Sequence, residues 1–264
     1  MSNFIKKLAK IKKKESIKAG FVSFVLLSDV SADLNLLAEN IREDWGIEIP
    51  SDDIRSDDAV AVTRISDMMV SVALMAGPIP NGEAVENAKT NFRWPEAVAV
   101  AENHKAHLLI SVMRHEQSLL DAAVLFVKIC SSCLKQPNAT GINTLGSVLA
   151  PDFYINIANA FIKENSFPIM NLVFFGIYSN DEGKTISAYT YGLEDFGKRN
   201  IEILNSSQSF EEIQELIIDL SSYVIEQDAV LEHGQTCGFT AEQKLPITES
   251  DGVAINGKTV KIEF

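Results

Sequence analysis

The sequence predicts an α+β fold, and three observations support this prediction. The 264 residues are 46% hydrophobic and 22% charged, which is typical of a globular chain with one large or two ordinary domains. From residue 20 onwards, short β-rich runs alternate with segments whose apolar residues recur at helical spacing. Turn signals such as Ser66-Asp67 and Asn256-Gly257 separate neighbouring β-rich runs, as expected for antiparallel hairpins.

The first half predicts a strand, a helix, two strands, a helical region and a further strand. Residues 21–27 form a short apolar run, and Ser31 or Asp33 is expected to begin a helix that ends near Trp45 at Gly46. The β-rich runs 59–65 and 68–75 follow, and the Gly-Pro-Ile-Pro segment 77–80 ends the second of them. Short helices at 83–89 and 95–103 then precede a strand at 108–112. This β-α-β-β-α-β order predicts a ferredoxin-like domain with two helices on one face of a four-stranded antiparallel sheet.

The second half begins with an apolar helix, residues 119–134, which we expect to be buried and to join the two halves. The elements expected after it are a strand at 140–145, a helix at 151–163, a hairpin at 169–178 and 185–191, a strand at 199–204, a helix at 210–226 and a hairpin at 253–264. Because this order echoes the first half, a divergent ferredoxin-like duplication is one hypothesis. The expected divisions are a lysine-rich tail at 1–19, a first domain at 20–115 and a second at 116–264.

Charge is distributed unevenly along the chain. Residues 1–20 contain seven lysines and one acid, whereas the whole chain carries −13, so residues 21–264 carry −19. An acidic body repels phosphate backbones and attracts basic proteins, which disfavours nucleic-acid binding and favours a basic protein partner.

The N-terminal tail has several interpretations. Phe4, Ile5, Leu8 and Ile11 fall at helical spacing among lysines, so residues 1–18 could attach weakly to an anionic membrane or bind nucleic acid. The ordinary interpretation is a frayed tail or a helix that lies on the acidic body. No apolar run approaches the ~20 residues that span a bilayer. The basic stretch is too long for a secretory signal, and three cysteines fit a reducing cytoplasm, so we expect a cytoplasmic protein.

His104 and His107 are the first candidates for chemistry. On a helix, a spacing of three places both side chains on one face, where they could bind a metal or serve a hydrolytic enzyme. On a strand, the same spacing places them on opposite faces. The ordinary interpretation is that one histidine ends the helix and the other packs at the edge of the sheet.

The cysteines offer a second candidate site. Cys130 and Cys133 form a C-x-x-C near the end of the apolar helix, where the dipole opposes the thiolate that redox chemistry requires. His233 and Cys237 could complete a zinc site with them, although about a hundred residues separate the pairs. The ordinary interpretation is that small apolar side chains fill a core.

An acidic loop is the expected partner-binding segment. Asp52, Asp53, Asp57 and Asp58 surround Arg55, without the ligand alternation and glycine of a calcium loop. The loop is either a solvated surface or a contact site for a basic partner.

The chain lacks the G-x-S-x-G elbow of serine hydrolases and the glycine-rich phosphate motifs, and the loop from Gly192 to Gly197 is expected to connect neighbouring strands. No cofactor is therefore expected.

Several segments resemble a bacterial family described only as domain of unknown function 4261. The resemblance rests on Met75–Pro80, Trp94-Pro95, His104–Ser111, Tyr189–Gly197 and Asn200–Ile203, and is expected to cover most of residues 20–264. It implies a bacterial protein and supplies no catalytic residues. By analogy, acidic α+β families of this kind include immunity proteins of bacterial toxin systems.

Two classes of function follow from the sequence. The favoured one is a non-enzymatic binding protein, of which an immunity protein that covers a basic toxin is one form. The alternative is a metal-binding or hydrolytic enzyme built around His104 and His107, and weak membrane attachment through the tail is a third possibility. The oligomeric state is left open.

Overall fold

The computed structural model describes residues 20–55, 59–240 and 242–264, and it confirms the α+β class. Contacts between residues divide the described chain into two compact units, residues 20–174 and 175–264. We call these the N-terminal and C-terminal units. No described helix has both the length and the apolar character needed to cross a membrane.

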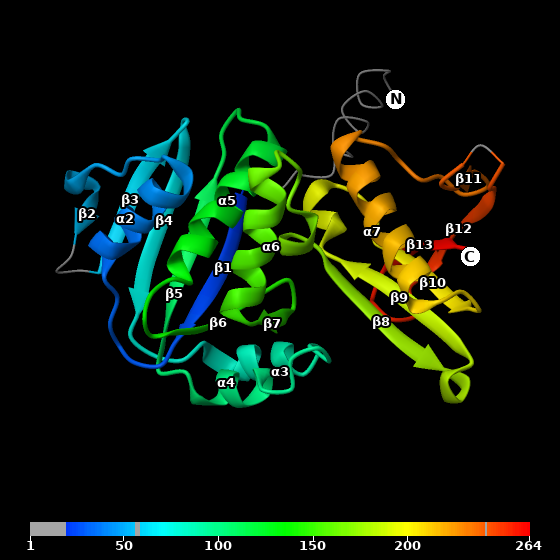
Figure 1. Ribbon diagram of the computed structural model, residues 1–264, viewed down its shortest axis with the longest axis horizontal. Coiled ribbons are helices and arrows are strands. Elements are labelled where there is room, and N and C mark those ends of the chain that lie inside the picture. The colour runs from blue at the N-terminus through cyan, green and yellow to red at the C-terminus, as the bar shows by residue number, and fades with distance from the viewer. Residues whose placement is uncertain (1–19, 56–58, 241) are drawn as a thin grey trace, which may run out of the picture. The chain divides into compact units, whose positions relative to one another are not determined.

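A seven-stranded sheet forms the centre of the N-terminal unit, in the order β2-β3-β4-β5-β1-β6-β7 (Figure 1). All of its pairings are antiparallel. The strands are β1 (Gly20–Leu27), β2 (Ile54–Arg55), β3 (Val60–Ile65), β4 (Met68–Met75), β5 (Ala106–Met113), β6 (Ala139–Thr144) and β7 (Ser147–Leu149). Ser66 and Asp67 join β3 to β4 with φ of 48° and 63°, as a tight hairpin turn requires.

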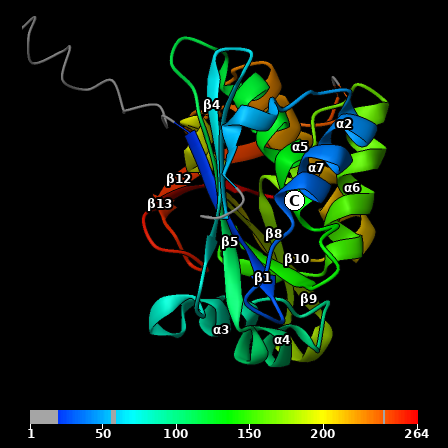
Figure 2. The same cartoon turned by 90° about the vertical axis from the view of Figure 1, so that its left-hand side faces the viewer.

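Three helices cover one face of this sheet: α2 (Leu34–Trp45), α5 (Leu119–Cys133) and α6 (Pro151–Lys163) (Figure 2). Helix α5 packs on β1 and β5 and contacts α2 and α6, so its apolar surface is buried, as expected. Phe21 on β1 stacks on Phe126 of α5 with ring centroids 5.5 Å apart. Asp33 begins α2 by accepting hydrogen bonds from the backbone of Asn35 and Leu36, and Gly46 ends it in the left-handed region.

In the first half of the chain the order of the predicted elements is confirmed, but the ferredoxin-like arrangement is not found. A ferredoxin-like sheet would place β1 between β4 and β5, whereas β5 lies between β4 and β1. The helices α3 (Glu83–Ala88) and α4 (Ala97–Asn103) explain the difference. A helix of seven residues is about 10 Å long, whereas a strand of eight residues is about 27 Å long. Helices α3 and α4 are therefore too short to run along the face of the sheet from one end of a strand to the other. The chain instead turns back at the end of the sheet, and β5 pairs directly with β4.

A six-stranded sheet with the order β11-β12-β13-β10-β9-β8 forms the C-terminal unit. Its strands are β8 (Phe174–Asn180), β9 (Thr185–Tyr191), β10 (Ile201–Ser206), β11 (Thr236–Cys237), β12 (Leu245–Asp251) and β13 (Lys258–Ile262). Helix α7 (Phe210–Glu226) packs on β9 and β10, and β10 runs parallel to β13. With one long helix and this order, the unit does not repeat the N-terminal sheet.

Two expected boundaries differ from the observed ones. Strand β6 pairs with β1, so residues 116–174 complete the first sheet, and the compact units meet near residue 174 instead of residue 115. The last hairpin pairs β12 with β13, and the Asn256-Gly257 turn lies within the loop between them. Residues 253 and 254 cannot join the strand because their backbone N–H groups bind a buried side chain, described next.

Candidate functional site

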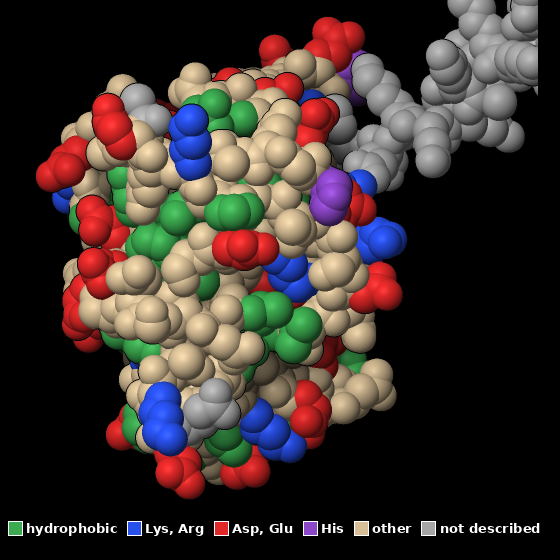
Figure 3. Space-filling model, turned by 90° about the vertical axis from the view of Figure 1, so that its right-hand side faces the viewer, with side chains coloured by type: hydrophobic (Ala, Val, Ile, Leu, Met, Phe, Trp, Pro, Cys, Tyr) green, Lys and Arg blue, Asp and Glu red, His purple; other side chains and the backbone are tan. Residues whose placement is uncertain are grey.

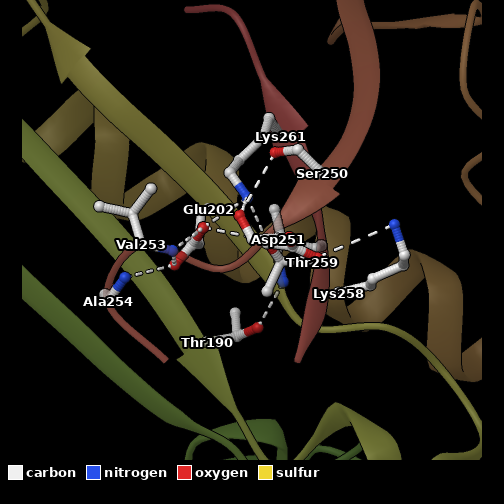
Figure 4. A network of polar contacts seen from close by, with 10 residues as sticks. Thr190, Glu202, Ser250, Asp251, Val253, Ala254, Lys258, Thr259 and Lys261 are labelled. Carbon is white, nitrogen blue, oxygen red and sulfur yellow. Dashed lines mark hydrogen bonds and ion pairs between the residues drawn. The ribbon is translucent and has the colours of Figure 1, made fainter. Parts of the chain in front are cut away.

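A buried ion pair organises the C-terminal unit. Glu202 of β10 is fully buried, and its Oε2 lies 2.7 Å from Nζ of Lys261 on the neighbouring β13 (Figure 4). Ile201 and Ile203 flank Glu202, and because side chains alternate along a strand, Glu202 points to the opposite face from both. A charge here requires compensation, since burial of an unpaired carboxylate is costly.

Hydrogen bonds to the carboxylate provide this compensation. The backbone N–H groups of Val253 and Ala254 donate to Oε1 at 3.0 and 2.8 Å, and the hydroxyl of Thr259 donates to Oε2 at 2.9 Å. Lys261 also donates to the carbonyl of Asp251 at 3.0 Å. Figure 4 shows these groups converging on Glu202. The network therefore holds the loop between β12 and β13 against β10.

The pKa of Glu202 indicates what this network can do. Burial alone raises the pKa, but hydrogen bonds from Lys261, Ala254, Val253 and Thr259 outweigh it and lower the pKa below the ordinary 4.5. A carboxylate with its oxygens already occupied and a low pKa is a poor general base. The network therefore serves to hold the fold together. The sequence patterns did not predict it. A single acid and a single lysine inside the apolar runs 201–204 and 259–262 are the signal that could have found it.

His104 and His107 both hold the loop that follows β4. His104 donates from Nδ1 to the carbonyl of Ala101 at 2.5 Å, and its Nε2 accepts the N–H of Ile79 at 2.8 Å. His107 donates from Nδ1 to the carbonyl of Gly77 at 2.9 Å. Both side chains are buried. Burial lowers the pKa of His107, and nearby His104 lowers it further, against the Gly77 carbonyl, which raises it.

These contacts leave little for a metal to bind. One nitrogen of His104 carries a proton and the other uses its lone pair on Ile79. Within the described ranges, no group of three or more His, Cys, Asp or Glu side chains is placed to hold a metal ion. Both histidines contact the same loop, Gly77–Ile79, as the alternative hypothesis of a shared site required. Their hydrogen bonds, however, attach the end of α4 and the start of β5 to this loop.

The four residues of the proposed zinc site are divided between the two units. Cys130 and Cys133 are buried in α5 of the N-terminal unit, and Cys237 is half-buried in β11 of the C-terminal unit. Burial raises the pKa of both thiols in α5. His233 accepts the N–H of Glu249 at 3.2 Å through Nδ1. The interpretation of Cys130 and Cys133 as core residues therefore agrees with their burial.

The predicted partner-binding loop is described only in part. Asp52 is exposed and Asp53 is half-buried in a short 3-10 helix, Ser51–Asp53, that precedes β2. Asp57 and Asp58 lie outside the described residues, as do the lysines of the tail.

The loop from Gly192 to Gly197 connects β9 to β10 through a 3-10 turn, as expected. Beside it lies a hollow of about 760 Å³ that includes Lys198, Arg199 and Lys258 among its lining residues. Each of these cations has a carboxylate partner, in Asp228, Glu249 and Asp251 respectively. The hollow therefore carries no concentrated positive charge for an anionic ligand.

Helix α7 presents an acidic outer face. Ile213, Leu216, Ile217 and Leu220 are buried, and the exposed positions Glu211, Glu215, Asp219 and Tyr223 recur every four residues along the opposite side. Residues 210–226 contain no lysine or arginine. In the view of Figure 3, Asp and Glu side chains lie along the left-hand edge, together with a few lysines and arginines. We call Glu211, Glu215, Asp219, Tyr223 and the exposed Glu226 the α7 stripe.

A comparison with known families matches part of the chain. The family model of a domain of unknown function, DUF4261, matches residues 189–263, which include the predicted segments Tyr189–Gly197 and Asn200–Ile203. The resemblance is confirmed over this range, whereas the segments before residue 189 lie outside it. The matched range contains the Glu202 network and α7. No curated protein and no solved structure matched the chain.

Proposed function

We propose that this protein is a non-enzymatic binding module that engages a basic protein partner through the α7 stripe. The role that we favour for this module is that of an immunity protein, which neutralises a basic toxin by binding it. One observation carries the proposal: the exposed face of α7 has four carboxylates and one tyrosine, and the helix contains no lysine or arginine.

The stripe is not explained by the stability of the helix. Glu211 and Glu212 lie in the first turn, where the dipole favours acids. Glu215 and Asp219 lack this benefit, and Glu226 lies at the C-terminal end, where the dipole opposes an acid. Acids four residues apart also destabilise a helix by about 0.2–0.5 kcal/mol per pair. Tyr223, 54% exposed, adds the kind of aromatic side chain that contributes much of the energy in interfaces.

Long-range charge supports the same partner. Residues 21–264 carry −19, which attracts a cationic protein and speeds its association at low salt. Three free cysteines with no disulfide among them support a reducing cytoplasm as the place of action. The engagement of both His104 nitrogens in the fold favours binding over the metal-dependent alternative.

The test is affinity capture from bacterial lysate with the full chain as bait, followed by mass spectrometry of retained proteins. A Glu215→Lys/Asp219→Lys bait should lose a basic protein that the wild type retains. A Glu43→Lys/Glu102→Lys bait reverses two exposed charges in the N-terminal unit and should keep it. With the purified partner, the association rate should fall at least tenfold between about 0.05 and 0.5 M salt.

Equal retention by all three baits would contradict the role of the α7 stripe. An association rate that does not change with salt would contradict the electrostatic basis of the proposal.

A further inference from the structure

The face of the N-terminal sheet opposite α2, α5 and α6 is apolar and exposed. Side chains alternate along each strand, and the outward set includes Val22, Val62, Met69, Met75 and Met113, each 39–53% exposed. Helices α3 and α4 lie at one end of the sheet (Figure 2), where they cover Leu26 and pack against Phe24. We call the outward side of β3, β4, β5 and β1 the open face.

The composition of the open face is unusual for an exposed sheet. Antiparallel sheets with one solvated face normally place polar residues there. Here the half-buried residues between the exposed ones are Val60, Ala73 and Leu109. The main polar contact is the hydrogen bond between the hydroxyls of Ser71 and Ser111, at 2.8 Å, which pairs these two groups within the chain. A contiguous apolar surface of this kind marks an interaction site.

Charge selects among the proteins that could cover the open face. None of its outward positions on β3, β4, β5 or β1 is Asp or Glu, although the body of the chain is strongly acidic. A basic partner would find no carboxylate there to pair with. Two copies of an acidic chain can approach closely only where neither presents carboxylates, and the open face meets this condition.

The rim and the size of the open face also fit a second copy. Arg64, Asp67 and Glu116 line the same hollow as Met69 and Met113 at one end of the face, so the rim carries both signs of charge and can pair with its own copy across a two-fold axis. Strand β3 has only six residues, and α3 and α4 cover the end of the face at β1. Four strands about 4.8 Å apart, with about six uncovered residues of about 3.4 Å each, give about 400 Å² per copy. The total of about 800 Å² is typical of a weak, transient interface, so we expect a dimer that dissociates on dilution.

We propose that this protein forms a symmetric dimer in which the open faces of two copies pack against each other. Flexible methionine side chains fill such a contact well because they adapt to irregular gaps. The proposal concerns the N-terminal unit and does not depend on the α7 stripe.

The decisive experiment labels the methionine methyl groups with ¹³C in the full chain and follows their NMR signals from about 5 to 500 µM. Met68 and Met69 are adjacent but lie on opposite faces, with 4% and 49% of their surfaces exposed. We expect concentration-dependent shifts for Met69, Met75 and Met113 and none for Met68. The mass from sedimentation should rise from monomer to dimer over the same range.

Substitution then tests the surface directly. Met69→Lys should weaken the dimer at least tenfold, whereas Val230→Lys, which changes an exposed apolar residue of the C-terminal unit in the same way, should leave it unchanged. A monomer at all concentrations, or a dimer whose formation leaves the three methionine signals unchanged, would overturn the proposal. Deletion of residues 1–19 gives a third readout: if it shifts these signals in the monomer, the tail and not a second copy covers the open face.

Discussion

At the scale of single residues, the sequence contains a few polar side chains whose positions decide local structure. Glu202 and Lys261 are the clearest pair, because they stabilise each other and a loop that no strand holds. His104 has the same kind of role in the N-terminal unit, where its Nε2 accepts a hydrogen bond from the N–H of Ile79. In both places the polar groups are engaged by the fold itself.

Glu202→Gln should lower the free energy of unfolding by about 3–5 kcal/mol, because it leaves Lys261 with an uncompensated buried charge. Glu263→Gln removes an exposed acid two residues after Lys261 and should change stability by less than about 0.5 kcal/mol. Urea unfolding at pH 7 measures both. Similar values for the two variants would show that the ion pair contributes little.

Glu202 should also make stability depend on pH. Since its pKa is lower in the folded chain than the ordinary 4.5, its contribution is fully present above pH 4.5 and is lost as the pH falls through the lowered value. We expect the difference in stability between wild type and Glu202→Gln to shrink as the pH is lowered from 5 to 3. A difference that stays constant over this range would contradict the assignment.

His104→Ala should destabilise the chain by about 1–3 kcal/mol, since it leaves the buried N–H of Ile79 without its acceptor. Elemental analysis of the wild type and of this variant should give the same metal content. Metal bound by the wild type and lost in the variant would instead support the metal-binding alternative.

At the scale of elements, the long helices were predictable because they carry strong local signals. Helices α2, α5, α6 and α7 have apolar residues at helical spacing, and α6 begins at a proline, as expected. Strand β12 was not predicted. Its residues Leu245–Asp251 alternate weakly between apolar and polar, and it is defined by pairing with β13. The expected hairpin was placed one strand too late because its turn signal lies at the end of a longer loop.

The burial of α5 determines the reactivity of its cysteines. Cys130 and Cys133 have no exposed surface, whereas Cys237 is only half-buried, and burial raises the pKa of all three thiols. A thiol reagent should therefore modify about one cysteine per native chain at pH 8, and peptide mapping should identify Cys237. All three should react after denaturation. Rapid modification of Cys130 in the native protein would contradict the packing of α5.

At the scale of the whole molecule, net charge is the dominant feature. The chain carries −13 at pH 7, and excess charge of one sign destabilises a compact state through self-repulsion. Raising the ionic strength from about 0.01 to 0.15 M shortens the Debye length from about 30 to 8 Å. We expect the melting temperature at pH 7 to rise with this change and to stay nearly constant near pH 4.8, the isoelectric point. A fall at pH 7 would show that attractive ion pairs outweigh repulsion.

The sequence by itself determined the α+β class, the long helices, most of the strands, the acidic surface and the resemblance that residues 189–263 confirm. These features depend on periodicity, caps and composition, which act over a few residues or over the chain as a whole. Only the tertiary structure decided which strands are neighbours, that β6 and β7 join the first sheet, and that His104 and Glu202 hold loops. Those outcomes depend on contacts between residues far apart in the chain. Such contacts depend on the lengths of the helices and loops that connect the strands and on the need to satisfy buried polar groups. Local sequence patterns do not contain that information.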